Sequence, residues 1–92
     1  MYAVKLVIQG KVQGVGYRRW FEQQAIALEL KGYVKNLATG EVEAIVIGTE
    51  EAIHKMLKHS LVGPLRAKVI QIDQQIIAIH DLDYCDFKMI RG

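Results

Sequence analysis

The chain has 92 residues, which leaves room for one domain, residues 1–92, with one hydrophobic core. Hydrophobic residues make up 51% and charged residues 24%, with one proline and eight glycines, and this composition excludes a disordered or collagen-like chain. The formal net charge of +2 is weaker than the usual footprint of a nucleic-acid-binding domain, but it is compatible with a small anionic ligand. We therefore expect a domain that binds a small molecule and no nucleic acid, with a monomer as the default state.

Cys85 is the one cysteine of the chain, so no internal disulfide can form. Small secreted domains usually carry an even set of cysteines, and a single one favours a reducing compartment. The apolar run after Met1 contains Lys5 and ends at Gly10, which is too short for a signal-peptide core or a membrane span. We therefore expect a cytoplasmic protein without a targeting or membrane segment.

The first half of the chain predicts a strand, a loop and a helix. Residues 4–9 alternate between aliphatic and mixed positions, which is the pattern of a strand with one buried face. Residues 10–16 contain three glycines, which are typical of a loop with unusual backbone dihedral angles. Residues 17–30 have apolar side chains at helical spacing, and Gly32 is expected to end this helix.

A hairpin and a second helix are predicted next. Residues 33–37 and 41–47 are rich in β-forming side chains, and residues 38–40 end in glycine, as short hairpin connections often do. Thr49 is a suitable N-cap for a helix whose apolar stripe continues to Ser60.

The last part of the chain predicts two more strands. They cover residues 66–74 and 87–90, whereas residues 75–86 show no clear pattern. The resulting order βαββαβ is typical of an α+β ferredoxin-like sandwich, in which two helices cover one face of an antiparallel sheet.

A glycine-rich loop that leads into a helix collects backbone N–H groups at the positive end of the helix dipole. Such a site favours phosphate or carboxylate, and the guanidinium of Arg18 can pair with two oxygens of one anion. The residue types alone leave a second interpretation open, in which the glycines only turn the chain and Arg18 is a solvated residue. The loop lacks the third glycine of a dinucleotide-binding fingerprint and the Gly-Lys-Ser/Thr of a P-loop, which disfavours NAD and ATP.

Two longer motifs indicate a known family. Residues 10–18 read Gly-Lys-Val-Gln-Gly-Val-Gly-Tyr-Arg and resemble the acylphosphatase signature Gly-x-Val-Gln-Gly-Val-x-Phe/Tyr-Arg. Residues 32–36 read Gly-Tyr-Val-Lys-Asn, and with Gly40, Val42 and Gly48 they are similar to the family's second motif, Gly-aromatic-Val-x-Asn-x-x-x-Gly-x-Val followed by a glycine. The chain thus resembles the acylphosphatase family in both motifs, and its length and element order extend the likeness.

The resemblance implies an enzyme, an acylphosphatase that hydrolyses an acyl phosphate to a carboxylate and inorganic phosphate without a cofactor. It implies that Arg18 is the catalytic arginine that binds the phosphate, and that Asn36 positions the attacking water. The role of Asn36 depends on the motif, because by itself it would be interpreted as a polar residue at a strand end. The resemblance also implies that the phosphate is bound by the backbone amides of Gln13, Gly14, Val15, Gly16 and Tyr17.

The implied chemistry needs no metal ion. The carboxylate that leaves an acyl phosphate has a conjugate acid with a pKa of ~4, so it departs as an anion at neutral pH without a general acid. His54 and His59 are five positions apart and do not form the i, i+4 pair of a helical zinc site. His80, Asp81 and Asp83 are better interpreted as a solvated loop than as a metal site.

One alternative function stays open. A ferredoxin-like module that binds an anion or RNA without catalysis would share the fold and the loop. Trp20 and Tyr33 offer rings for base stacking, but the Lys/Arg-Gly-aromatic-Gly/Ala-aromatic pattern of RNA-recognition motifs is absent from the sequence. A binding module has no need of Asn36, so the presence of both Arg18 and Asn36 favours the hydrolase.

Overall fold

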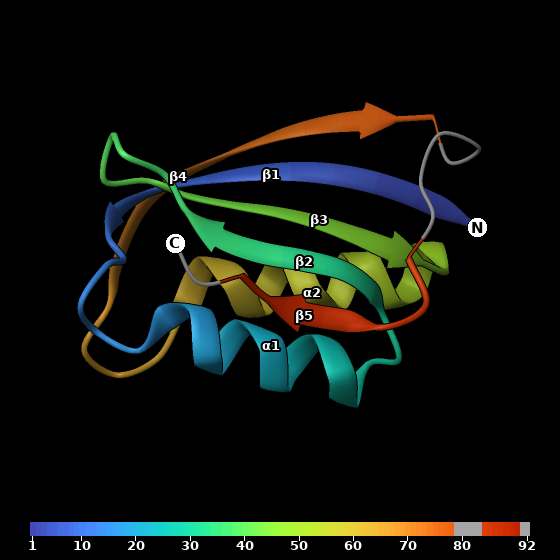
Figure 1. The fold of residues 1–92 in the computed structure, drawn as a ribbon, viewed down its shortest axis with the longest axis horizontal. Coiled ribbons are helices and arrows are strands. Elements are labelled where there is room, and N and C mark those ends of the chain that lie inside the picture. Colours follow the sequence, from blue (N-terminus) through green and yellow to red (C-terminus); the bar gives the residue numbers. More distant parts are fainter. Residues whose placement is uncertain (79–83, 91–92) are drawn as a thin grey trace.

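The computed structural model describes residues 1–78 and 84–90 and arranges them as a sheet with two helices on one face (Figure 1). Its strand order is β4-β1-β3-β2-β5. The fold confirms the predicted ferredoxin-like sandwich. In chain order the elements are β1 (Tyr2–Lys11), α1 (Tyr17–Ala27), β2 (Lys31–Asn36), β3 (Val42–Gly48), α2 (Glu50–Val62), β4 (Lys68–Ile77) and β5 (Phe87–Met89).

The sheet is mixed rather than antiparallel throughout. β1 pairs antiparallel with β3 and β4, and β2 pairs antiparallel with β3. The short β5 pairs in parallel with β2, from Gly32 opposite Phe87 to Val34 opposite Met89. Because the two strands run in the same direction, the end of β5 reaches the same end of the sheet as the end of β2.

The main core lies between the sheet and the helices, as the alternation in residues 4–9 predicts. Val4, Leu6 and Ile8 of β1 are buried in one cluster with side chains of both helices. Full burial of an aliphatic side chain of this size stabilises a fold by about 1.5–3 kcal/mol. The helices contribute Phe21, Ala25, Ile53 and Met56 to the cluster.

The end of α1 differs from the prediction. The helix ends at Ala27, Leu28 is its C-cap, and the residue with a left-handed backbone is Glu29, with φ of 58°. Gly32 instead lies within β2 with φ of 128°. A Cβ atom on Gly32 would collide with the backbone oxygen of Ile45 on β3, so glycine is required for the close approach of two strands.

Strand pairing moves the bounds of β4 from those predicted. The strand begins at Lys68 and ends at Ile77 rather than at residue 74. Ile77 pairs with Ala3 of β1, so backbone hydrogen bonding extends the strand beyond its apolar pattern. Part of the unassigned segment 75–86 is therefore strand.

The second helix begins as the sequence predicts. Thr49 lies directly before α2, and its Oγ1 accepts a hydrogen bond of 3.1 Å from the backbone N–H of Ala52. The two glutamates of the first turn lie at the positive end of the helix dipole, where a negative charge is favourable. The helix continues past Ser60 to Val62.

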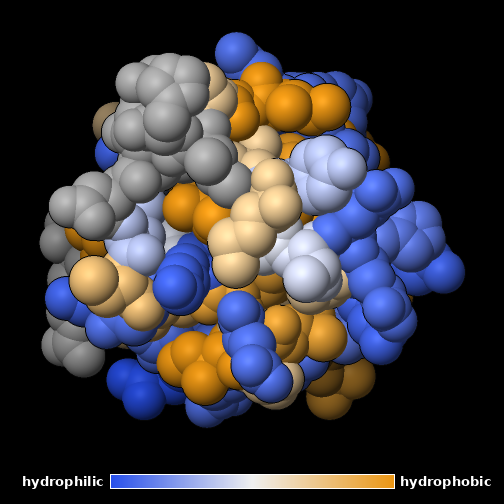
Figure 2. All heavy atoms as spheres, turned by 90° about the vertical axis from the view of Figure 1, so that its right-hand side faces the viewer, coloured by the Kyte–Doolittle hydropathy of each residue, from blue (hydrophilic) through white to orange (hydrophobic). Residues whose placement is uncertain are grey.

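The N-terminus lies at the end of the molecule opposite the β1–α1 loop and the β2–β3 turn (Figure 1). Figure 2 faces this N-terminal end, where hydrophobic and hydrophilic side chains are interspersed. Met1 and Tyr2 are exposed there. The glycine loop and Asn36 thus lie together at the other end of the sheet.

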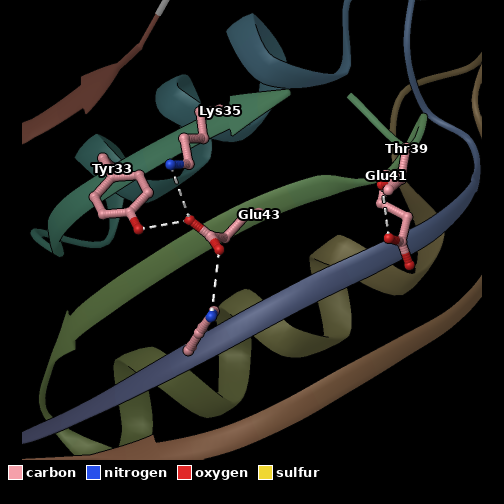
Figure 3. A network of polar contacts seen from close by, with 6 residues as sticks. Tyr33, Lys35, Thr39, Glu41 and Glu43 are labelled. Carbon is pink, nitrogen blue, oxygen red and sulfur yellow. Dashed lines mark hydrogen bonds and ion pairs between the residues drawn. The ribbon is translucent and has the colours of Figure 1, made fainter. Parts of the chain in front are cut away.

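A polar network joins three neighbouring strands on the face of the sheet that the helices do not cover (Figure 3). The carboxylate of Glu43 on β3 lies 3.3 Å from Nζ of Lys5 and 3.5 Å from Nζ of Lys35, and it accepts a hydrogen bond of 2.7 Å from Tyr33. Burial by itself raises the pKa of Glu43. The hydrogen bonds from Tyr33 and Lys5 and the two lysine charges outweigh burial and hold the pKa below its ordinary value.

We expect Glu43→Gln to lower the free energy of unfolding near neutral pH and to have less effect in acid. Because the folded-state pKa of Glu43 lies below the ordinary value of 4.5, the carboxylate stabilises the fold above that pH. This contribution is lost as the pH falls through the folded-state pKa. Urea unfolding of both proteins from about pH 7 to about pH 3 measures it.

The matched control is Glu51→Gln, whose exposed carboxylate has a single i, i+4 partner, Lys55 at 3.4 Å. An exposed helix pair contributes ~0.5 kcal/mol and the α2 dipole less than about 1 kcal/mol, so the effect near neutral pH should be smaller than that of Glu43→Gln. A loss of stability in Glu43→Gln that stays constant with pH would show that the network does not act through the Glu43 charge.

Candidate active site

A pocket of about 390 Å³ opens where three segments meet. They are the loop between β1 and α1, the end of β2 and the end of β5, and they lie at one end of the molecule (Figure 1). The lining residues are Val12, Gln13, Gly14, Gly16, Tyr17, Arg18, Arg19, Asn36 and Met89.

The loop itself offers backbone donors to this pocket. Gly14 and Gly16 have left-handed backbones, with φ of 73° and 78°. A Cβ on either glycine would meet open space, so the backbone angles and not crowding favour glycine there. None of the backbone amides of residues 13–17 donates a hydrogen bond to another described residue. Unpaired N–H groups before a helix form a concave site for an anion.

Charge at the start of α1 points to the same kind of ligand. Gly16 caps the helix without a side-chain hydrogen bond, and the first turn contains no acidic residue. It contains Arg18 and Arg19 instead, which line the pocket. A cation near the positive end of a helix dipole is unfavourable by about 0.3–1 kcal/mol. An anion in the pocket would turn this repulsion into attraction.

The guanidinium of Arg18 is oriented by the C-terminal segment. Its Nη1 donates a hydrogen bond of 2.7 Å to the carbonyl oxygen of Ile90. The N–H of Ile90 in turn donates a hydrogen bond of 2.8 Å to the carbonyl of Val34 on β2. Arginine has five N–H donors, so the bond to Ile90 leaves others for a ligand.

Asn36 is the last residue of β2 and lines the same pocket. Its Oδ1 atom is buried and has no hydrogen-bond partner within the part of the chain that the structure describes. Buried amide oxygens nearly always have a partner, so Asn36 is a pocket residue with unused hydrogen-bonding capacity.

The side chain of Gln13 does not serve as a free pocket donor. Its Nε2 donates hydrogen bonds of 2.9 Å to the carbonyl oxygens of both Leu37 and Glu41, at the two ends of the β2–β3 turn. Gln13 therefore faces the pocket while its amide nitrogen connects the loop to the hairpin.

Tyr17 and Val15 have mainly structural positions. The Tyr17 ring is buried, and its hydroxyl donates a hydrogen bond of 2.8 Å to the carbonyl of Ser60 on α2. Burial raises the pKa of Tyr17 far above its usual value, although the bond to Ser60 acts in the opposite direction, so the phenol stays neutral. Val15 packs against the core and is not among the pocket-lining residues.

Three lining residues were missed in the sequence: Val12, Arg19 and Met89. Of these three, Arg19 could have been expected, because a second arginine in the first turn of the predicted helix lies beside the proposed anion site. Met89 gave no such signal, because its place in the site depends on the parallel pairing of β5. Its backbone N–H donates a hydrogen bond of 2.9 Å to Oε2 of Glu22, which helps to hold β5 against α1.

Two further observations concern metals and membranes. Among residues 1–78 and 84–90, no three His, Cys, Asp or Glu side chains gather as a metal site would require. His54 and His59 are exposed on α2, and the cluster of residues 80–83 lies outside the described residues. Neither helix in the described ranges is long and apolar enough to cross a bilayer.

Comparison with known proteins agrees with the fold. The acylphosphatase family model matches residues 4–89. An acylphosphatase of Rhodopseudomonas palustris (strain BisB18) is 40% identical over 79 residues, which cover 86% of this chain and 80% of that protein. An acylphosphatase of Colwellia psychrerythraea is 48% identical over 68 residues, 74% of this chain and 76% of that protein.

Solved structures give the same result at the level of the backbone. The crystal structure of an acylphosphatase from Bacillus subtilis matches with a TM-score of 0.93 and 27% identity, over 99% of this chain and 100% of that chain. The chain therefore belongs to the acylphosphatase family and is an enzyme, an acyl phosphate hydrolase.

Proposed function

We propose that this enzyme cleaves the carboxyl–phosphate bond of small acyl phosphates without a metal ion, with Arg18 binding the phosphoryl group and Asn36 positioning the attacking water. The observation that carries the proposal is that one pocket contains loop amides without a partner among residues 1–78 and 84–90, the Arg18 guanidinium and the Asn36 amide. The first two bind an anion, and the third has hydrogen-bonding capacity left for a water.

The reaction consists mainly of positioning and charge stabilisation. A water oxygen attacks phosphorus, and the bond between phosphorus and the acyl oxygen breaks. The electron pair of that bond leaves with the carboxylate, whose conjugate acid has a pKa of ~4 and therefore needs no proton at neutral pH. Loop amides and Arg18 are fixed donors for the charge that spreads over the phosphoryl oxygens.

The proton of the attacking water goes to a phosphoryl oxygen of the substrate in this mechanism. Within the described part of the chain, the residues that line the pocket include no carboxylate, histidine or cysteine that would act as a general base. The products are a carboxylate and inorganic phosphate.

We expect the purified protein to hydrolyse an aromatic acyl phosphate such as benzoyl phosphate, at a rate that does not change when a chelator is added. The good leaving group removes the need for a Lewis acid. The measurement is the disappearance of benzoyl phosphate with and without EDTA. Loss of activity with EDTA would contradict the metal-free mechanism, and a folded protein that binds phosphate but hydrolyses no acyl phosphate would favour the non-catalytic module.

We expect inorganic phosphate to inhibit competitively and to raise the melting temperature, because it binds the folded loop and not the unfolded chain. The gain in unfolding free energy is about 2.7 kcal/mol at a hundred times the dissociation constant. Phosphate also stabilises proteins generally through exclusion from their surface, so the shift is compared with that of Arg18→Ala. Equal shifts in both proteins would mean that Arg18 does not hold the anion.

The proposal also includes a cytoplasmic monomer of one domain that binds no nucleic acid. Light scattering after size-exclusion chromatography measures the oligomeric state. For a monomer we also expect the specific activity to stay constant over a wide range of protein concentrations.

A further inference from the structure

Asn36 lies directly before a turn that has little support of its own. The turn between β2 and β3 is closed by a bond of 2.8 Å from the N–H of Leu37 to the carbonyl of Glu41, and one of 3.2 Å from Gly40 to Leu37. Residues 38–40 are exposed. Beyond its pairing with Val42, the backbone at the end of β2 can therefore be further restrained by contacts from outside the hairpin.

Gln13, in the loop between β1 and α1, supplies such contacts. Its two bonds of 2.9 Å reach the carbonyls of Leu37 and Glu41, which lie 24 and 28 positions away in the sequence. Both partners are carbonyl oxygens, which only accept, so the nitrogen of the Gln13 amide must face them. The bonds are partly buried, which reduces competition from water.

The geometry points to Gln13 as a positioning residue, whose side chain fixes Asn36 relative to the phosphate-binding loop. This inference rests on the proposed function of Asn36. The peptide group between Asn36 and Leu37 donates its N–H, in a hydrogen bond of 2.8 Å, to the carbonyl oxygen of Glu41, and the same oxygen accepts from Gln13. Gln13 thus restrains the acceptor of this peptide group, and through the Leu37 carbonyl it also holds the next peptide group along the chain. The Asn36 Oδ1 has no partner among the described residues, so the position of this amide depends on its backbone. A displacement of about 1 Å in a catalytic group can cost ~10²-fold in rate.

The variant that tests this role is Gln13→Met, which keeps the length of the side chain and removes both donors. We expect kcat to fall by about 10- to 100-fold, whereas KM and the dissociation constant of inorganic phosphate should change by less than about threefold. Arg18 and the loop amides are unchanged in this variant. Gln13→Glu places a carboxylate against two carbonyl oxygens, so its kcat should fall further.

Gln9→Met is the matched control. Gln9 lies on β1 and donates one bond of 2.9 Å to Oδ2 of Asp73 on the neighbouring strand β4. Its variant loses the same kind of donor without touching the pocket, and kcat should stay unchanged. If Gln13→Met weakens phosphate binding as much as it lowers kcat, Gln13 shapes the loop and the inference is wrong.

A double-mutant cycle with Asn36→Ala separates this inference from the proposed function. If Gln13 acts through Asn36, then Gln13→Met should lower kcat in the wild-type background and have no further effect in Asn36→Ala. Multiplicative losses in the double variant would show that Gln13 acts independently and would overturn the inference. If Asn36→Ala alone leaves kcat unchanged, the proposed function of Asn36 is wrong, and with it the positioning of Asn36 by Gln13.

Discussion

Replacement of Arg18 by alanine is expected to lower kcat/KM by about 10³-fold, through both a higher KM and a lower kcat. The guanidinium contacts the phosphoryl group in the ground state, and it stabilises the charge that develops on the oxygens in the transition state. Its loss therefore affects both parameters. Steady-state hydrolysis of benzoyl phosphate gives KM and kcat, and circular dichroism verifies that the variant is folded.

Two controls make the Arg18 result specific. Arg18→Lys keeps the charge but loses the planar pair of donors, so it should recover only part of the activity. Lys31→Gln removes a positive charge from the start of β2, at the opposite end of that strand from Asn36, and should leave the kinetics unchanged. If Arg18→Ala raised KM alone, the arginine would bind substrate without stabilising the transition state.

Asn36→Ala is expected to lower kcat by about 10²-fold while KM and the dissociation constant of phosphate stay nearly unchanged. In the proposed mechanism Asn36 contacts the water and not the phosphoryl group. Removing its amide therefore leaves anion binding intact and leaves the nucleophile poorly oriented. Single-turnover hydrolysis together with calorimetric binding of inorganic phosphate separates the two effects.

Competing explanations for a slow Asn36 variant have distinct signatures. Displacement of the loop would weaken phosphate binding, and general destabilisation would lower the melting temperature without lowering kcat of the folded fraction. A near-normal kcat in a folded Asn36→Ala variant would show that another group positions the water.

Much of the fold could be predicted because it depends on residues close together in the sequence. The alternation in residues 4–9, the glycine at the end of the 38–40 turn and the Thr49 cap each act within a few positions. The helix end could not be read in the same way. The sequence predicts that Gly32 ends the first helix. In the structure Gly32 is needed for the close approach of β2 to Ile45 on β3, and Glu29 is the residue with the left-handed backbone.

The site likewise contains residues that a local pattern indicates and residues that only long-range packing brings in. An anion site with Arg18 at the glycine loop is one of two interpretations that local chemistry allows, and the family motif favours it over a simple turn. Asn36 required the family motif, because a lone asparagine at a strand end has no distinctive pattern. The contacts of Met89 and the side-chain bonds of Gln13 arise only when distant segments pack, so no local pattern encodes them.

The two arginines in the first turn of α1 bring selection for activity and selection for heat resistance into conflict. At this turn the unliganded protein gains stability when a basic side chain becomes acidic, and the same change repels the substrate. Selection for thermal tolerance alone would therefore favour acidic residues in this turn at the expense of anion binding. When phosphate or acyl phosphate is abundant, its binding to the pocket raises the free energy of unfolding and offsets the destabilisation by the two arginines.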